Sequence, residues 1–124
     1  MKKRGAKIKQ GIAVLPFGMK RMKYEMDARA ALLAVQRGIC NEQHIVDLWV
    51  LADLCERLEP GETHILKHCE SVKKLCEAIH NKTCDGLAGV SLTASAHILL
   101  EWVHKQNNSK VCRIAMEQIQ RLAA

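Results

Sequence analysis

The chain has 124 residues, which is about the length of one domain. Its 48% of apolar and 26% of charged residues exclude a disordered tail, and two prolines and seven glycines are too few for a loop-rich β sandwich. The net charge of +6 is concentrated at one end, because the first 24 residues carry eight cations and no acid. The remaining hundred residues carry 11 Lys and Arg against 13 Asp and Glu, so the sequence indicates a near-neutral domain with a basic N-terminal arm.

The first helix is predicted after an extended arm over residues 1–18, in which Pro16 and three glycines interrupt helical periodicity. From Met19 to about Gln36, apolar residues recur at helical spacing, and Gly38 is the predicted C-cap. The apolar stripe of this helix consists of Met19, Met22, Met26, Ala30 and Leu33. Methionines at this spacing usually fill a core, which is the interpretation we favour; the alternative is an adaptable partner surface beside the basic arm.

The second helix is predicted over residues 42–58, with Asn41 as its N-cap. Apolar residues lie almost all round this helix, so we expect it to be the central and most buried one. Its acidic residues Asp47, Asp53 and Glu56 are expected to point outward, which leaves no pair of carboxylates on a buried face.

The third helix is predicted from Glu62 or Thr63 to about Asn81, after a turn at Glu59-Pro60-Gly61. One seam of this helix is expected to face the core: Ile65, Cys69, Val72, Cys76 and Ile79. Charged residues are expected on its other side: Lys67, Glu70, Lys73, Lys74 and Glu77.

Two further helical segments follow a loop over residues 82–91. Ser91 or Thr93 is the predicted cap of a helix that continues to about Gln106. Asn107-Asn108-Ser109 then separates a fifth helix from the fourth, or only kinks one long helix.

The predicted fold class is all-α, because no segment alternates with the period of a strand. We expect a compact bundle of four to five helices over residues 19–124, with the extended basic arm over residues 1–18. No apolar run is long enough for a signal peptide or a membrane span. The six cysteines are therefore predicted to be reduced thiols in a cytoplasm.

The third helix is rich in cysteine and histidine. His64 and His68 are four residues apart, and Cys76, His80 and Cys84 repeat at the same interval. Thiolate and imidazole groups are the ligands that zinc prefers, but the chain has no CxxC knuckle, and Cys76 already lies on the apolar seam. We expect these residues to be core or surface residues with no metal and no cofactor, and a metal- or thiol-dependent module is the lowest-ranked alternative.

No constellation predicts catalysis. The sequence has no glycine-rich phosphate loop, and the glycines at Asp85-Gly86 and Ala88-Gly89 are typical of turns. A cysteine–histidine nucleophile would need a neighbouring base and an orienting third group that the sequence does not indicate. We therefore predict that the chain is not an enzyme and has no catalytic residue.

The basic arm is the strongest functional candidate. Cations at this density are attracted to phosphate or to an acidic protein surface, and the attraction weakens with salt. A basic N-terminus can also be merely solubilising. The predicted partner-binding residues are Lys2, Lys3, Arg4, Lys7, Lys9, Lys20, Arg21 and Lys23.

The order of the segments resembles that of small helical proteins encoded by bacteriophages, prophages and integrated mobile elements. The resemblance rests on residues 27–38 (DARAALLAVQRG), residues 42–52 (EQHIVDLWVLA), the loop near Asp85-Gly86 and the stretch around Leu99, Glu101, His104 and Gln106, and it spans residues 12–122. It implies a cytoplasmic protein that binds a host or phage macromolecule, for example an inhibitor or regulator, and it assigns no active-site residue.

Together, these features predict a non-enzymatic binding protein that occludes a surface of a host or phage complex, while the arm adds electrostatic attraction. The alternative is a regulator that binds nucleic acid directly as a dimer, with the arm on the phosphate backbone. No membrane partner is expected.

Overall fold

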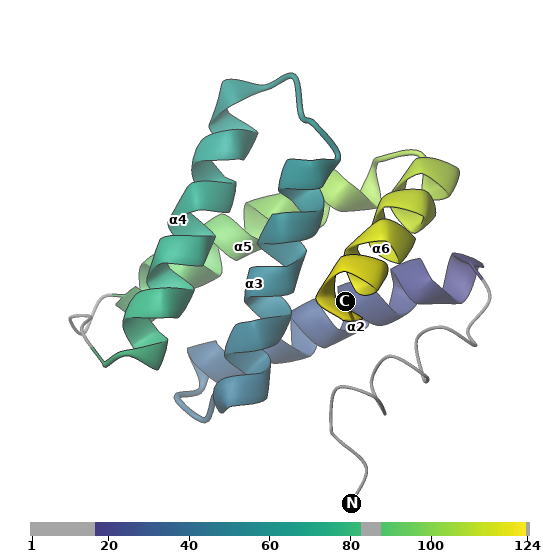
Figure 1. The fold of residues 1–124 in the computed structure, drawn as a ribbon. Helices are drawn as coiled ribbons and strands as arrows, with labels where there is room; N and C mark the ends of the chain where they lie inside the picture. The colour runs from purple at the N-terminus through teal and green to yellow at the C-terminus, as the bar shows by residue number, and fades with distance from the viewer. Residues whose placement is uncertain (1–16, 83–87, 124) are drawn as a thin grey trace, which may run out of the picture.

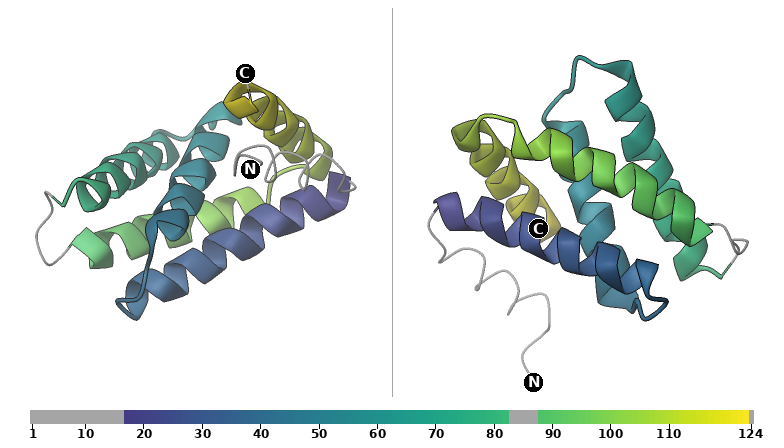
Figure 2. Two further views of the ribbon diagram at one scale, coloured as in Figure 1. Left: turned by 60° about the horizontal axis from the view of Figure 1, so that its bottom comes forward. Right: turned by 180° about the vertical axis from the view of Figure 1, so that it is seen from behind.

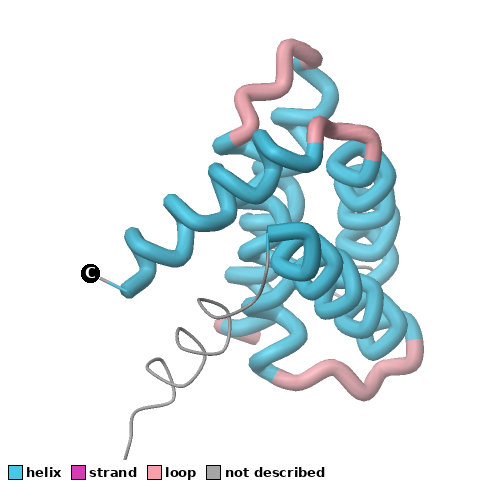
Figure 3. The backbone as a smooth tube through the Cα atoms, turned by 90° about the vertical axis from the view of Figure 1, so that its right-hand side faces the viewer, coloured by secondary structure: helices cyan, strands magenta, loops and turns pink. Residues whose placement is uncertain are grey.

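The computed structural model describes residues 17–82 and 88–123, with the side chains of residues 22–82 and 89–121. All five elements in these ranges are helices, which confirms the all-α prediction (Figure 1; Figure 3). They are α2 (Phe17–Gln36), α3 (Glu42–Arg57), α4 (Thr63–His80), α5 (Ala88–His104) and α6 (Asn108–Ala123). Most of the predicted arm, residues 1–16, lies outside the described residues, and its last two predicted residues belong to α2.

The end of α2 confirms the predicted role of Gly38. Its φ of 71° lies in the left-handed region, where a side chain would be strained. The Gly38 N–H donates to the Val35 carbonyl and the Ile39 N–H donates to the Ala34 carbonyl, which is the Schellman pattern of a helix end. The chain therefore turns sharply into α3.

Asn41 begins α3 as predicted. Its side-chain oxygen accepts from the His44 N–H at 3.1 Å, and the His44 ring Nδ1 accepts from the Asn41 N–H at 3.0 Å. This reciprocal capping box satisfies two backbone donors that have no partner within the helix.

The helices pack around α3, which contacts each of the other four described helices. α2 and α5 run antiparallel side by side and form the face that Figure 2 (right) turns to the viewer, with α3 and α6 behind them. α4 packs on α3 and α5, and α6 lies over the N-terminal half of α2 (Figure 1). The core is aliphatic and rich in cysteine, with Leu48, Leu99 and Cys69 fully buried.

The beginning of α5 differs from the sequence prediction. The helix begins at Ala88, so neither Ser91 nor Thr93 is its cap. The Thr93 hydroxyl instead donates to the Gly89 carbonyl one turn earlier, at 2.8 Å, which is a bond made inside a helix. The break before α6 is real, because Asn107 caps that helix by accepting from the Lys110 N–H at 3.0 Å. None of the described helices is long and apolar enough to cross a membrane.

Replacing Asn41 with alanine should lower the free energy of unfolding by about 0.5–2 kcal/mol, because the first turn of α3 loses its capping acceptor. Asn41→Asp keeps an acceptor oxygen and should remain close to the wild type. Urea unfolding followed by circular dichroism measures both variants, and equal midpoints for Asn41→Ala and the wild type would contradict the role of the cap.

Candidate functional site

The structure describes only some of the predicted partner-binding residues. Five arm cations lie outside the described residues: Lys2, Lys3, Arg4, Lys7 and Lys9. Lys20 and Arg21 belong to α2, and their side chains are not described. Lys23 is exposed on α2 and pairs with Asp27 at 3.1 Å. The contacts of the arm with a partner therefore stay a prediction.

The histidines and cysteines of α4 do not converge. Cys76 is buried in the core, His80 lies exposed 3.5 Å from a Glu42 carboxylate oxygen, and Cys84 lies outside the described residues. Within residues 17–82 and 88–123, no three potential metal ligands lie together. His68 has another contact, since its Nδ1 lies 3.1 Å from the Ser95 hydroxyl and links α4 to α5.

Asp53 corrects one expectation from the sequence. Its side chain does not point outward but is almost completely buried, at 3% exposed. The Asp53 carboxylate accepts hydrogen bonds from Gln118 Nε2 and Arg57 Nε at 2.9 Å each and from Lys73 Nζ at 3.0 Å. Arg121 approaches the same carboxylate at 3.4 Å. One carboxylate thus joins α3, α4 and α6.

The donors around Asp53 decide its charge state. Burial disfavours the carboxylate, but hydrogen bonds from Gln118, Arg57 and Lys73 outweigh burial, so the pKa of Asp53 is lowered. Lys73 also bonds to Glu56 at 3.2 Å and lies over the Trp49 ring at 4.7 Å. Its predicted place on the outer side of α4 is therefore wrong.

Sequence reasoning missed this network because Gln118 lies 65 positions from Asp53. One signal was present in the sequence. Asp53 interrupts an otherwise apolar stretch of α3, and a helix that is apolar nearly all round has little solvent-exposed face for a polar side chain. Gln118 itself is fully buried, and its Oε1 accepts no hydrogen bond among the described residues. The network gives Asp53 a structural role.

The methionines of α2 overturn the core interpretation. Met22 is 55% exposed, Met26 61% and Leu33 50%, so these side chains point away from the bundle. We call these three residues the α2 stripe. Met19 shares their spacing, but its side chain is not described.

Small residues explain why the stripe is outside. The inner face of α2 is made of Ala28, Ala31, Ala34 and Leu32, all buried. Short side chains allow the neighbouring helices to approach the α2 backbone closely, which leaves no volume for methionine on that side. The sequence gives α2 two apolar faces, and the face with the alanines is the one that packs in the core.

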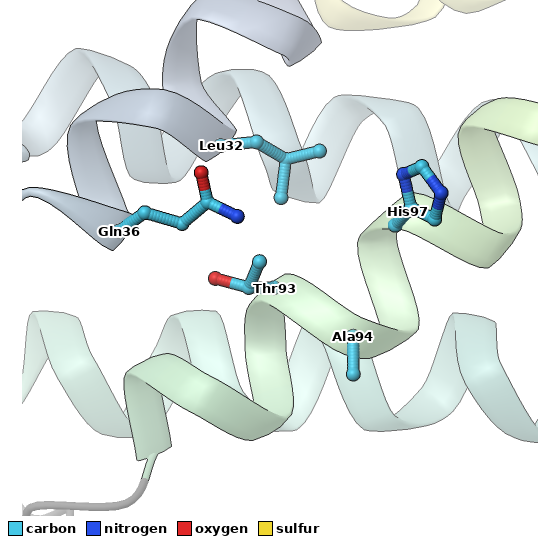
Figure 4. Close-up of a pocket in the computed structure, with 5 residues that line it drawn as sticks. All are labelled: Leu32, Gln36, Thr93, Ala94 and His97. Carbon is cyan, nitrogen blue, oxygen red and sulfur yellow. The ribbon is translucent and has the colours of Figure 1, made fainter.

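A hollow of about 450 Å³ lies between α2 and α5. Leu32 and Gln36 line it from α2, and Thr93, Ala94 and His97 line it from α5 (Figure 4). The hollow offers both apolar surface and groups that can form hydrogen bonds.

The charges near this surface are unequal on the two helices. Arg29 of α2 and Arg37, the first residue after α2, are exposed, and neither forms an ion pair with another residue in the described parts of the chain. The nearby acids of both helices have histidine partners on α5: Glu101 of α5 lies 3.1 Å from His97, and Glu25 of α2 lies 2.8 Å from His104. Arg29 and Arg37 thus differ from Lys23, whose ammonium group pairs with Asp27.

Four cysteines are buried in the described core: Cys55, Cys69, Cys76 and Cys112. A hydrogen bond with Cys69 and burial raise the pKa of Cys55, while the same hydrogen bond lowers the pKa of Cys69. Burial raises the pKa of Cys76 to about 12. The predicted role of Cys69 and Cys76 as small apolar core residues is consistent with this burial.

No family model matches the chain, and no curated protein or solved structure is significantly similar to it.

Replacing Asp53 with alanine should lower the free energy of unfolding by about 1–3 kcal/mol, since the buried Gln118 amide loses its acceptor while the partly exposed cations can turn to water. The pH dependence of the stability is tested with Asp53→Asn, which has no ionisable group at this position. The folded pKa lies below the unfolded value, so the stability from ionised Asp53 is present above the ordinary value of 3.8 and is lost as pH falls through the folded pKa. Urea unfolding at neutral and acid pH should show the difference between Asp53→Asn and wild type shrinking in acid; a pH-independent difference would contradict it.

Native alkylation should separate the cysteines. Iodoacetamide should modify half-buried Cys40 fastest among the described cysteines, whereas Cys55, Cys69, Cys76 and Cys112 should react only after unfolding. Mass spectrometry of peptides from native and urea-treated protein measures this order. Equal rates for Cys40 and Cys76 in the native protein would be incompatible with the burial described above.

Proposed function

We propose that this chain is a helical, non-enzymatic binding protein that acts by covering a surface of a macromolecular partner. The observation that carries the proposal is the α2 stripe. Single exposed apolar side chains are common, but Met22, Met26 and Leu33 follow one another along the same face of a helix. An aligned apolar surface of this kind is typical of a helix that receives a partner.

The chemistry of the stripe suits recognition. Methionine is flexible and polarisable, so it fits surfaces of different shape without a large penalty. The helix behind the stripe is held through its alanine face, so the partner meets a preformed surface and less conformational entropy is lost on binding. Occlusion follows because any partner surface that contacts α2 is removed from other contacts.

The basic arm extends the proposal. Its cations lead directly into α2 in the sequence, so electrostatic attraction by the arm would bring an acidic partner toward the stripe and speed encounter. The resemblance to small phage and mobile-element proteins suggests a host or phage complex in a bacterial cytoplasm as the target. This part of the proposal rests on the sequence alone.

A nucleic-acid-binding regulator is the second candidate, and the eight cations of the first 24 residues favour it. Binding through phosphates would require no apolar surface and would fall steeply with salt. The two functions therefore predict opposite sensitivity to substitution: the arm cations would decide nucleic-acid binding, and the α2 stripe would decide protein binding.

The triple variant Met22→Ser, Met26→Ser, Leu33→Ser tests the proposal, because all three side chains are exposed and their loss should leave the fold intact. We expect a bacterial protein retained from host lysate by the wild type to be lost by at least about tenfold in this variant. Quantitative mass spectrometry of the retained proteins measures the loss, and circular dichroism confirms folding.

A matched control replaces Val46 and Leu66, which are exposed apolar residues of α3 and α4, with serine. This control should retain the partner. Equal retention by the triple variant and the control would refute the stripe as the binding surface. Retention of duplex DNA that disappears at moderate salt and on neutralising Lys2, Lys3 and Arg4 would favour the regulator instead.

A further inference from the structure

We propose that the partner element covering α2 is an acidic amphipathic helix, with two carboxylates spaced about two turns apart and an apolar residue between them. This inference rests on the proposed function, because it takes the α2 stripe as a binding surface and identifies the chemistry of its occupant. The juxtaposition that carries it is a row of apolar side chains with unpaired cations in the same row.

The row follows helical spacing. Met22 and Met26 are four residues apart, Arg29 comes three residues after Met26, Leu33 four after Arg29, and Arg37 four after Leu33. Residues at these intervals are neighbours on one face of a helix. Each described member is exposed, so the row is one continuous ridge on the surface of α2.

The cations have a defined separation along this ridge. Arg29 and Arg37 are eight residues apart, which is about 12 Å at the rise of an α-helix. Leu33 lies between them. Neither guanidinium pairs with a carboxylate in residues 17–82 and 88–123, although Asp27 is close in sequence and is held by Lys23 instead.

A second helix laid along this ridge has the same rise per residue, so its residues seven or eight positions apart face Arg29 and Arg37. Carboxylates at those two positions would form charge-assisted pairs with the guanidinium groups. An apolar residue midway between them would contact Leu33, and further apolar residues on the same face would reach Met22, Met26 or the hollow.

Charge repulsion disfavours two other possible occupants of this surface, a second copy of α2 and the basic arm. A second copy of α2 would bring its own Arg29 and Arg37 against the same row, and the basic arm carries five cations and no acid in residues 1–16. Both would be repelled. An anionic bilayer would satisfy the charge, but a flat surface would leave the hollow beside Leu32 and His97 unfilled, whereas a helix side chain can enter it.

A displayed library of amphipathic helices tests the inference. One face carries fixed leucines, and each flanking position may be Glu, Ser or Lys; the library is selected against the full chain. We expect Glu to be enriched over Lys by about tenfold at pairs of positions seven or eight apart. The double variant Arg29→Glu, Arg37→Glu should reverse the preference toward Lys.

The matched control is Lys67→Glu, Lys74→Glu, which reverses two exposed cations seven residues apart on α4 and should keep the preference for Glu. The inference is overturned if no charge preference is selected, or if reversal at Arg29 and Arg37 leaves the preference unchanged. Sedimentation with phosphatidylglycerol vesicles that requires the same two arginines would also overturn it, in favour of a membrane surface.

A failure of the acidic-helix inference can be distinguished from a failure of the proposed function. If the library shows no preference while the serine triple variant still loses its partner, the α2 stripe remains a binding surface with a different occupant. If the triple variant keeps its partner as well, both proposals fail.

Discussion

A single buried charge constrains the arrangement of this bundle. Asp53 lies in the C-terminal half of the most central helix, and its buried carboxylate depends on the hydrogen-bond donors that surround it. The donors come from three helices: Arg57 from α3 itself, Lys73 from α4, and Gln118 with Arg121 from α6. Alternative packings of α4 or α6 on α3 would break at least one of these bonds. A buried carboxylate adds little net stability once it is paired, but it penalises other arrangements strongly.

The position of α6 has consequences for α2. With α6 held against α3, the two helices cover the inner side of α2, where Ala28 and Ala31 are fully buried. The larger apolar residues of α2 then have nowhere to pack and face outward. The exposure of Met22 and Met26 is therefore a consequence of how the core closes. A helix with two apolar faces can pack one face in the core and bind a partner with the other.

Local signals in the sequence located most helix ends. Asn41 and Gly38 act through their own backbone surroundings, so their roles could be predicted without knowledge of the fold. The seam of α4 was also predictable, because only one face of that helix is apolar. Local chemistry was misleading at Thr93, where a hydroxyl that resembles a cap is used inside the helix. The arm residues, such as Lys2 and Arg4, remain predictions because the described structure begins at Phe17.

The sequence by itself determined the all-helical class, the order of the described helices and the concentration of positive charge at one end, because periodicity, caps and composition depend on neighbours along the chain. Only the tertiary structure decided which apolar face of α2 is buried, and that Asp53 and Lys73 turn inward to meet each other. Both outcomes depend on volumes and partners supplied by helices distant in sequence. A pattern shows that a face is apolar, but the space left by the other helices decides whether that face enters the core or remains exposed for a partner.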